Sequence, residues 1–164
     1  MDAVFVGRFQ PFHLGHFRVV EEYQEEFGDF SLVMGSAGKS RTPENPLTAG
    51  ERKEIIRSCF PEIKVLELED EGSTEEDNRQ WVEKLEEETG SEVVISQNDL
   101  VKRLVQEYTD MELLEQDLYD PEKFSATEVR RRIREGEEWK DLVPDCAIQN
   151  IKDCQEVLRE TKEA

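Results

Sequence analysis

The chain's only two histidines lie close together in the segment Gly7–His16, which reads GRFQPFHLGH. His13 and His16 are three residues apart, so at the start of a helix they can face the same pocket. The segment follows the apolar run Ala3–Val6 and precedes a helical pattern, and a helix N-terminus offers free N–H groups to an anion. Arg8 adds a guanidinium suited to phosphate. These residue types at this spacing predict a phosphate-binding loop.

Two other roles are open for these histidines. A single histidine is often a satisfied interior residue, so one could cap the helix while the other packs in the core. The whole histidine content falls in one strand-to-helix turn beside an arginine, which favours the phosphate role. A metal site is the weaker alternative, because His-x-x-His lacks a third ligand at useful spacing.

A second segment, Ser125–Arg130 with the sequence SATEVR, also has phosphate-binding character. Ser125 and Glu128 have the spacing of a capping box that opens a helix. Thr127 supplies a second hydroxyl, and Arg130 lies one turn into the helix. By itself this is an ordinary capped helix with arginines facing water. Together with the histidine segment, it predicts a polyphosphate-binding site.

These segments resemble motifs of the nucleotidyltransferase superfamily, and most closely those of archaeal nicotinamide-mononucleotide adenylyltransferases. The matching patterns are GRFQPFHxGH, GSAxKSxTxENPxTAGER, NxxWV and, each with one change, SGN and SGTEVRRR. They fall at residues 7–16, 35–52, 78–82, 96–98 and 125–132. The resemblance spans residues 3 to about 144, and ENPLTAGER is far more specific than HxGH. Ala126 replaces a glycine, which narrows the backbone angles open to that position, and Asp99 replaces a proline.

The resemblance implies that the 5′-phosphate of nicotinamide mononucleotide attacks the α-phosphorus of ATP, forming NAD and pyrophosphate with Mg²⁺ as the metal. It implies that His13, His16, Arg8 and Arg130 are the catalytic residues. The residues that it implies bind ATP are Gly7, Arg8, Phe9, His13, His16, Lys39, Ser125, Thr127 and Arg130. The residues that it implies bind nicotinamide mononucleotide are Asn78, Trp81 and Asn98. For Trp81 a core position on an amphipathic helix is the alternative.

Two different functions remain open. One is nucleotidyl transfer to another acceptor of the superfamily, pantetheine phosphate or flavin mononucleotide; Asn78 and Trp81 favour nicotinamide. The other is a sensor that binds adenine nucleotides or NAD without turnover, which would be free to lose both histidines and Arg130. The residues Lys39, Ser40 and Arg41 are expected in a lid over the phosphates, whereas Thr48 and Arg52 are expected to be a helix cap and an ion-pair partner.

The elements that position these residues alternate along the chain. Apolar runs predict strands at 3–6, 30–34, 63–68, 93–95 and 112–114. Helices are predicted at 14–26, from the Thr48–Glu51 capping box to about 60, after Ser73, at 100–108, at 125–136 and from Pro144 onward. The alternation predicts a Rossmann-like, doubly wound parallel sheet with a helical C-terminal tail. A single domain over 1–164 is expected, with a core of about 1–144 and a C-terminal helix of about 145–164.

Composition limits the partners. Acidic residues outnumber basic ones by 40 to 21, giving a formal net charge of −19, which repels nucleic acid. The excess acid is either a solvated surface or an adaptation to a salty cytoplasm whose ions screen the self-repulsion. Apolar stretches are too short for a signal peptide or a membrane span, so a cytoplasmic location is expected. Archaeal relatives form homo-oligomers, and the resemblance implies a similar assembly here.

The three cysteines, Cys59, Cys146 and Cys154, are odd in number and show no Cys-x-x-Cys spacing. This pattern predicts neither a disulfide framework nor a zinc cluster. The cysteines are therefore expected to be reduced and at least partly buried.

Overall fold

The computed structural model describes residues 1–70, 72–114 and 120–161. Within these residues the chain forms a five-stranded sheet whose hydrogen-bonded order is β3-β2-β1-β4-β5. The strands are β1 (Ala3–Gly7), β2 (Phe30–Met34), β3 (Lys64–Glu67), β4 (Val93–Ser96) and β5 (Glu112–Leu113). Every neighbouring pair is parallel. The predicted α/β fold is thus confirmed, and the strand order reverses between β1 and β4, where such sheets bind ligands.

Contacts divide the chain into two compact units. The sheet unit holds the described residues within 1–7, 22–37 and 64–117. The helical unit holds those within 8–21, 38–63 and 118–164. Both histidines and Arg130 belong to the helical unit, whereas Trp81 belongs to the sheet unit.

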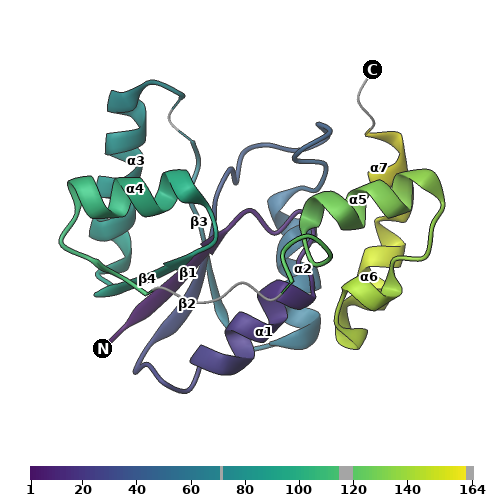
Figure 1. Ribbon diagram of the computed structural model, residues 1–164, viewed down its shortest axis with the longest axis horizontal. Coiled ribbons are helices and arrows are strands. Elements are labelled where there is room, and N and C mark those ends of the chain that lie inside the picture. The colour runs from purple at the N-terminus through teal and green to yellow at the C-terminus, as the bar shows by residue number, and fades with distance from the viewer. Residues whose placement is uncertain (71, 115–119, 162–164) are drawn as a thin grey trace. The chain divides into compact units, whose positions relative to one another are not determined.

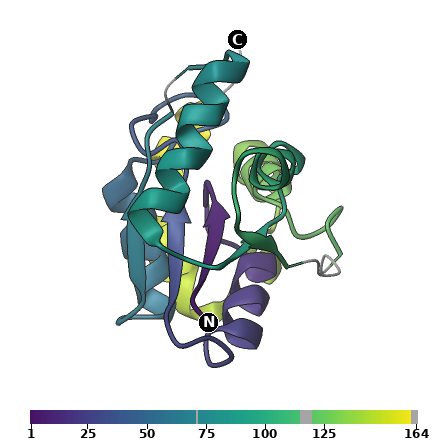
Figure 2. The same cartoon turned by 90° about the vertical axis from the view of Figure 1, so that its left-hand side faces the viewer.

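In the sheet unit, helices α3 (Glu75–Thr89) and α4 (Asp99–Tyr108) pack together and against the strands (Figures 1 and 2). Val4 and Val6 point to one face of β1 because side chains alternate along a strand, and both join the core formed with α3 and α4. Helix α3 begins at a capping box formed by Thr74 and Asp77, one residue after the predicted Ser73, and ends at Gly90. Gly90 has a φ of 59°, which favours glycine.

Asp99 is the first residue of α4 (Asp99–Tyr108). The Asn98 side chain caps this helix by accepting the Val101 N–H at 3.1 Å. Asp99 therefore lies in the first turn, where a carboxylate is favoured by the helix dipole.

In the helical unit, the predicted capping box of α2 (Ala49–Cys59) is present: Thr48 and Glu51 each accept the other's main-chain N–H. Helix α5 (Ala126–Glu135) begins with Ser125 Oγ accepting the Glu128 N–H at 3.1 Å and ends at Gly136, whose φ is 73°. The Glu128 carboxylate pairs with Arg131 instead of closing a capping box. Ala126 is an ordinary helical residue, so its replacement of glycine introduces no backbone strain.

The C-terminal region differs from the single helix expected over 145–164. It consists of the 3₁₀ turn η2 (Asp145–Ala147) and two short helices, α6 (Ile148–Asp153) and α7 (Gln155–Glu160). The helix breaks at Cys154, whose N–H bonds to the carbonyl three residues back, at Ile151, and tightens the turn. Residues 162–164, part of the expected frayed end, lie outside the described residues. Among the described helices, none has the length and apolar character that a membrane span requires.

The expectation of three reduced cysteines is wrong. Cys59 at the end of α2 forms a disulfide with Cys146 in η2, with Cα atoms 5.2 Å apart, whereas Cys154 is free and buried. The two bonded residues are 87 positions apart in the sequence and meet because α2 packs against η2. The spacing of cysteines along the sequence does not indicate a bond between residues so far apart. The prediction from their number and spacing was therefore wrong.

Candidate active site

The loop after β1 turns sharply and is tied to the segment before α2. Phe9 has a φ of 53°, and the Gln10–Pro11 peptide bond is cis. The buried Gln10 side chain donates to the Leu47 carbonyl at 3.0 Å and accepts the Leu47 N–H at 2.9 Å. The Gln10 side-chain amide thus bonds to both main-chain groups of Leu47, as a neighbouring strand would, and holds the histidine loop against the segment before α2.

Both histidines are held as neutral rings by the main chain at the start of α1 (Leu14–Tyr23). His13 Nδ1 accepts the Gly15 N–H at 3.0 Å, and His16 Nδ1 accepts the His13 N–H at 3.1 Å. A nitrogen that accepts a hydrogen bond carries no proton, so the neutral ring bears its proton on Nε2. The ring centroids are 3.7 Å apart. The loop therefore presents two neighbouring N–H donors.

Burial keeps these rings uncharged. His13 and His16 are 3% and 8% exposed. Burial lowers the pKa of His13 to about 3. Burial, and then repulsion from His13, lowers the pKa of His16 well below its ordinary value. At neutral pH both groups can donate a hydrogen bond to a phosphate oxygen, and neither is available as a cation in the free protein.

Gly15 has a packing reason to be glycine. A Cβ atom at this position would lie 2.8 Å from Cε1 of His13 and 3.1 Å from its Nδ1. These distances are shorter than van der Waals contact, so any side chain would displace the His13 ring. The glycine of the His-x-Gly-His pattern is thus required by the close approach of the ring to the main chain.

Arg130 joins α5 to the histidine loop. Its Nη1 donates to the Gln10 carbonyl at 2.8 Å, and its Nε is buried with no hydrogen-bond partner among the described residues. Burial, with smaller repulsions from Arg134 and Arg8, lowers the pKa of Arg130 to about 10. The Glu44 carboxylate acts in the opposite direction and raises this pKa. Arg130 is thus a buried cation near two other guanidinium groups and one carboxylate, and a bound anion would stabilise its charge.

Arg52 is one of the largest fully buried side chains among the described residues, and it links three segments of the helical unit. Its Nη1 donates to the Arg8 carbonyl at 3.0 Å, its Nε to the Thr48 carbonyl at 3.3 Å, and its Nη2 to the Lys39 carbonyl at 3.4 Å. The side chain therefore positions the main chain of both the histidine loop and the segment around Lys39. The sequence predicted a structural role for Arg52 but not this one, because carbonyl partners leave no mark in the sequence.

The segment expected to form a lid, which includes Lys39 and Arg41, has no regular secondary structure, in agreement with the sequence. Arg41 pairs with Glu51 at 2.7 Å and also donates to the Pro46 carbonyl. Arg134 of α5 donates to the Pro43 carbonyl. Lys39 is exposed. The segment is thus anchored at Arg41 and Pro43, while the Lys39 side chain lies at the surface.

The remaining residues predicted to contact ATP lie at the ends of elements. Gly7 ends β1, and the side chains of Arg8 and Thr127 are exposed. Ser125 is the N-cap of α5, and its Oγ already accepts one N–H of that helix. Among the described residues, the structure brings together the histidine loop and Arg130 through hydrogen bonds.

The residues predicted to contact nicotinamide mononucleotide lie in the sheet unit. Trp81 is 8% exposed and belongs to the apolar core, although its indole Nε1 finds no hydrogen-bond partner among the described residues. Asn78 is half-buried on the first turns of α3, and Asn98 caps α4.

Sequence reasoning missed Gln10 and Arg134 as parts of this site. Gln10 lies inside the histidine segment, so its position there was the only available signal. In the described part of the chain, no three His, Cys, Asp or Glu side chains are grouped so that they could hold a metal ion.

Comparisons with known proteins identify the family of this chain. The model of the cytidylyltransferase-like family matches residues 4–132. The chain is 36% identical to the nicotinamide-nucleotide adenylyltransferase of Methanolobus tindarius, covering 96% of this chain and 91% of that protein. It is 37% identical to the protein of the same name from Methanosarcina acetivorans, covering 97% and 92%.

A solved structure shares the fold. It is the bifunctional NMN adenylyltransferase/ADP ribose pyrophosphatase from Francisella tularensis complexed with AMP and a Mn ion, with a TM-score of 0.74 and 20% identity. The match covers 98% of this chain and 51% of that one, so the chain spans about half the length of the bifunctional protein. The resemblance found in the sequence is confirmed by the family match and by the archaeal relatives: the chain belongs to the cytidylyltransferase-like family and, within it, to the nicotinamide-nucleotide adenylyltransferases.

Proposed function

We propose that this chain transfers the adenylyl group of ATP to nicotinamide mononucleotide. An oxygen of the nicotinamide mononucleotide 5′-phosphate forms a bond to the α-phosphorus of ATP. The bond from that phosphorus to the bridging oxygen of the β-phosphate breaks, so the products are NAD and pyrophosphate. The second pKa of a phosphomonoester is about 6, so the nucleophile is already ionised at neutral pH and needs no general base.

The observation that carries this proposal is the pair of neutral histidines beside a buried arginine. Because both Nδ1 atoms accept main-chain N–H groups, each Nε2–H is directed to donate. In our proposal His13 and His16 bind the ATP phosphates, and His16 donates to the α-phosphate as charge develops there. Donors fixed in place before the reaction stabilise that charge without reorganising.

Arg130 is proposed to bind the β- and γ-phosphates. Its guanidinium is oriented by the Gln10 carbonyl, and its lowered pKa reflects an environment that disfavours its charge until an anion arrives. Arg8, Lys39, Ser125 and Thr127 are proposed as further ligands of the triphosphate, with Gly7 and Phe9 shaping the loop. Catalysis would then rest on alignment and charge neutralisation, with no covalent enzyme intermediate.

For the acceptor we propose Asn78, Trp81 and Asn98. The cationic nicotinamide ring favours an aromatic face, and the Trp81 indole N–H is a buried donor available to a polar group. The names of the archaeal relatives support nicotinamide over pantetheine phosphate or flavin mononucleotide.

Four finer points belong to the same proposal. Mg²⁺ would enter with the ATP substrate and would supply positive charge to its phosphates. The Mn ion in the Francisella tularensis structure supports a divalent metal. We further propose that residues 1–164 make one nucleotidyltransferase domain, that the chain forms homo-oligomers and that it acts in the cytoplasm.

Two adjacent arginines of α5 provide a matched test. Arg130→Gln removes the guanidinium that bonds to the histidine loop, whereas Arg131→Gln removes one that pairs with surface glutamates. With ATP, Mg²⁺ and nicotinamide mononucleotide, we expect pyrophosphate release to fall about 10²–10³-fold in the first variant and to change little in the second. Equal activity of the two variants would contradict the role of Arg130.

A further inference from the structure

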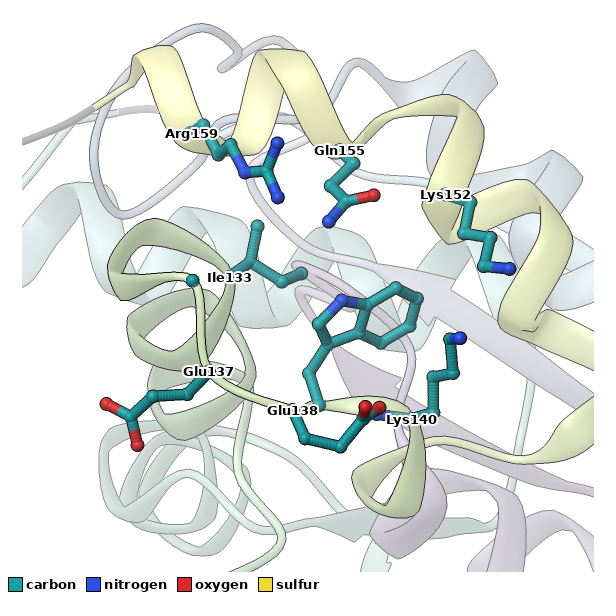
Figure 3. Close-up of a pocket in the computed structure, with 9 residues that line it drawn as sticks. Ile133, Glu137, Glu138, Lys140, Lys152, Gln155 and Arg159 are labelled. Carbon is teal, nitrogen blue, oxygen red and sulfur yellow. The ribbon is translucent and has the colours of Figure 1, made fainter.

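The helical unit contains a cavity that the proposed reaction does not use. Its volume is about 230 Å³ (Figure 3). It is lined by the end of α5, the 3₁₀ turn η1 (Lys140–Leu142) with the residues before it, α6 and α7. The lining includes Ile133, Trp139, Lys140, Lys152, Gln155 and Arg159. None of the residues assigned above to ATP or to nicotinamide mononucleotide lines it.

Three cationic side chains surround this cavity: Lys140, Lys152 and Arg159. Within the described part of the chain, none of the three forms an ion pair. Some exposed cations of this chain, which has 40 acidic and 21 basic residues, do have a carboxylate partner. The exposed arginines Arg79, Arg103 and Arg131, for example, each pair with a glutamate.

The two acidic residues that also line the cavity do not neutralise these cations. Glu137 pairs with Arg131 at 2.7 Å, and Figure 3 shows its carboxylate turned away from the cavity. Glu138 accepts the main-chain N–H of Lys140 at 3.1 Å. Three cations and two carboxylates line the cavity, so its lining carries a formal net charge of about +1 on a strongly acidic protein.

The walls of the cavity are formed by ordered, packed elements. Ile133 and Trp139 are 1% and 4% exposed, so they make a rigid apolar base. Arg134 of α5 donates its Nε–H to the Leu158 carbonyl of α7 at 3.2 Å, which ties two walls together. In Figure 3 the side chains of Gln155 and Arg159 extend from α7 toward the α5 wall that holds Ile133. A neutral amide and a guanidinium thus face the same space.

We propose that this cavity is a second ligand site, specific for a small anion that carries phosphate groups, with pyrophosphate as the simplest member of the class. Lys140, Lys152 and Arg159 supply charge for a di- or trianion, and Gln155 supplies a neutral hydrogen-bond donor. The volume suits a small anion better than a complete dinucleotide, since sites for drug-sized ligands usually measure about 300–1,000 Å³.

Trp139 provides a local readout. The chain has two tryptophans, so Trp81→Phe leaves Trp139 as the only indole. In this background we expect a saturable change in Trp139 fluorescence on titration with sodium pyrophosphate at constant ionic strength. Lys152→Ala combined with Arg159→Ala should weaken the apparent affinity about tenfold or more, because charge-assisted bonds are lost. Lys102→Ala, which removes a cation from α4, should leave it unchanged.

Arg130→Gln separates this site from the proposed active site. The fluorescence change should survive in this variant. A change that is lost in Arg130→Gln but kept in the Lys152/Arg159 double variant would overturn the proposal, as would loss with Lys102→Ala. A shift of the Trp139 emission maximum that follows protein concentration but not pyrophosphate would also overturn the proposal, since the cavity would then be a contact between copies of the chain.

A second measurement avoids the tryptophan substitution. Equilibrium dialysis of the otherwise unaltered protein with radiolabelled pyrophosphate should give one bound anion fewer per chain in the Lys152/Arg159 double variant. An unchanged number of bound anions would refute a site in this cavity.

Discussion

The stability of this protein should depend on pH through His13, whose neutral ring is buried in the fold. In the unfolded chain a histidine gains a proton below about pH 6.5, whereas in the folded state His13 has a pKa of about 3. The unfolded state therefore binds more protons between these two values. The stability that His13 contributes is fully present above about pH 6.5 and is lost as the pH falls toward 3.

The size of this effect follows from the width of that interval. Each pH unit below the unfolded pKa costs about 1.4 kcal/mol until the folded pKa is reached. At about pH 5 the cost for His13 is therefore about 2 kcal/mol. The side chain is only 3% exposed, so solvent screening does not reduce this value greatly.

His13→Asn isolates the contribution, because an asparagine Oδ1 can accept the Gly15 N–H that His13 Nδ1 accepts and does not titrate. Urea unfolding of wild type and variant would be measured at about pH 7.5 and about pH 5. Carboxylates common to both proteins cancel in the difference. We expect the wild type to lose about 2 kcal/mol more than the variant on acidification. An equal loss in both would refute the assignment of His13 as a buried neutral group.

Three further predictions concern the stability of the folded protein. Arg52→Met should lower the free energy of unfolding by about 3–5 kcal/mol in urea, because the carbonyls of Arg8 and Thr48 lose a charged donor; a loss below about 1 kcal/mol would contradict its anchoring role. Cys146→Ser should cost about 2–4 kcal/mol, since its disulfide with Cys59 closes a long loop, and an unchanged denaturation midpoint would count against that bond. Because salt screens the repulsion within a net charge of −19, we expect the melting temperature to rise by about 5 °C from dilute buffer to molar KCl. A constant melting temperature would show that this repulsion does not lower the stability of the protein.

The parts of the fold that depend on local chemistry could be predicted from the sequence. Thr48 with Glu51, and Ser125 with Glu128, mark helix starts because a cap side chain accepts the main-chain N–H three residues further on. The strands 30–34 and 93–95 were visible as apolar runs because both faces of a parallel sheet are buried. The histidine loop was visible because its residue types are rare elsewhere in the chain.

The features that depend on tertiary contact could not be predicted. The Cys59–Cys146 disulfide joins residues 87 positions apart, and the buried Arg52 bonds to carbonyls that every residue carries. The break at Cys154 follows from a tightened turn in a segment whose residues are all compatible with helix. For Trp81 the sequence left both a core and a binding role open, and the structure places it in the core while leaving its N–H without a partner among the described residues.

The most direct test of the central claim is the formation of NAD from ATP, Mg²⁺ and nicotinamide mononucleotide by the purified protein, beside a His16→Asn variant checked for folding. We predict NAD and pyrophosphate in equal amounts from the wild type, with pantetheine phosphate and flavin mononucleotide inactive as acceptors, and a loss of about 10²-fold or more in the variant. Binding of ATP without pyrophosphate release, whichever acceptor is supplied, would contradict adenylyl transfer and leave a nucleotide sensor.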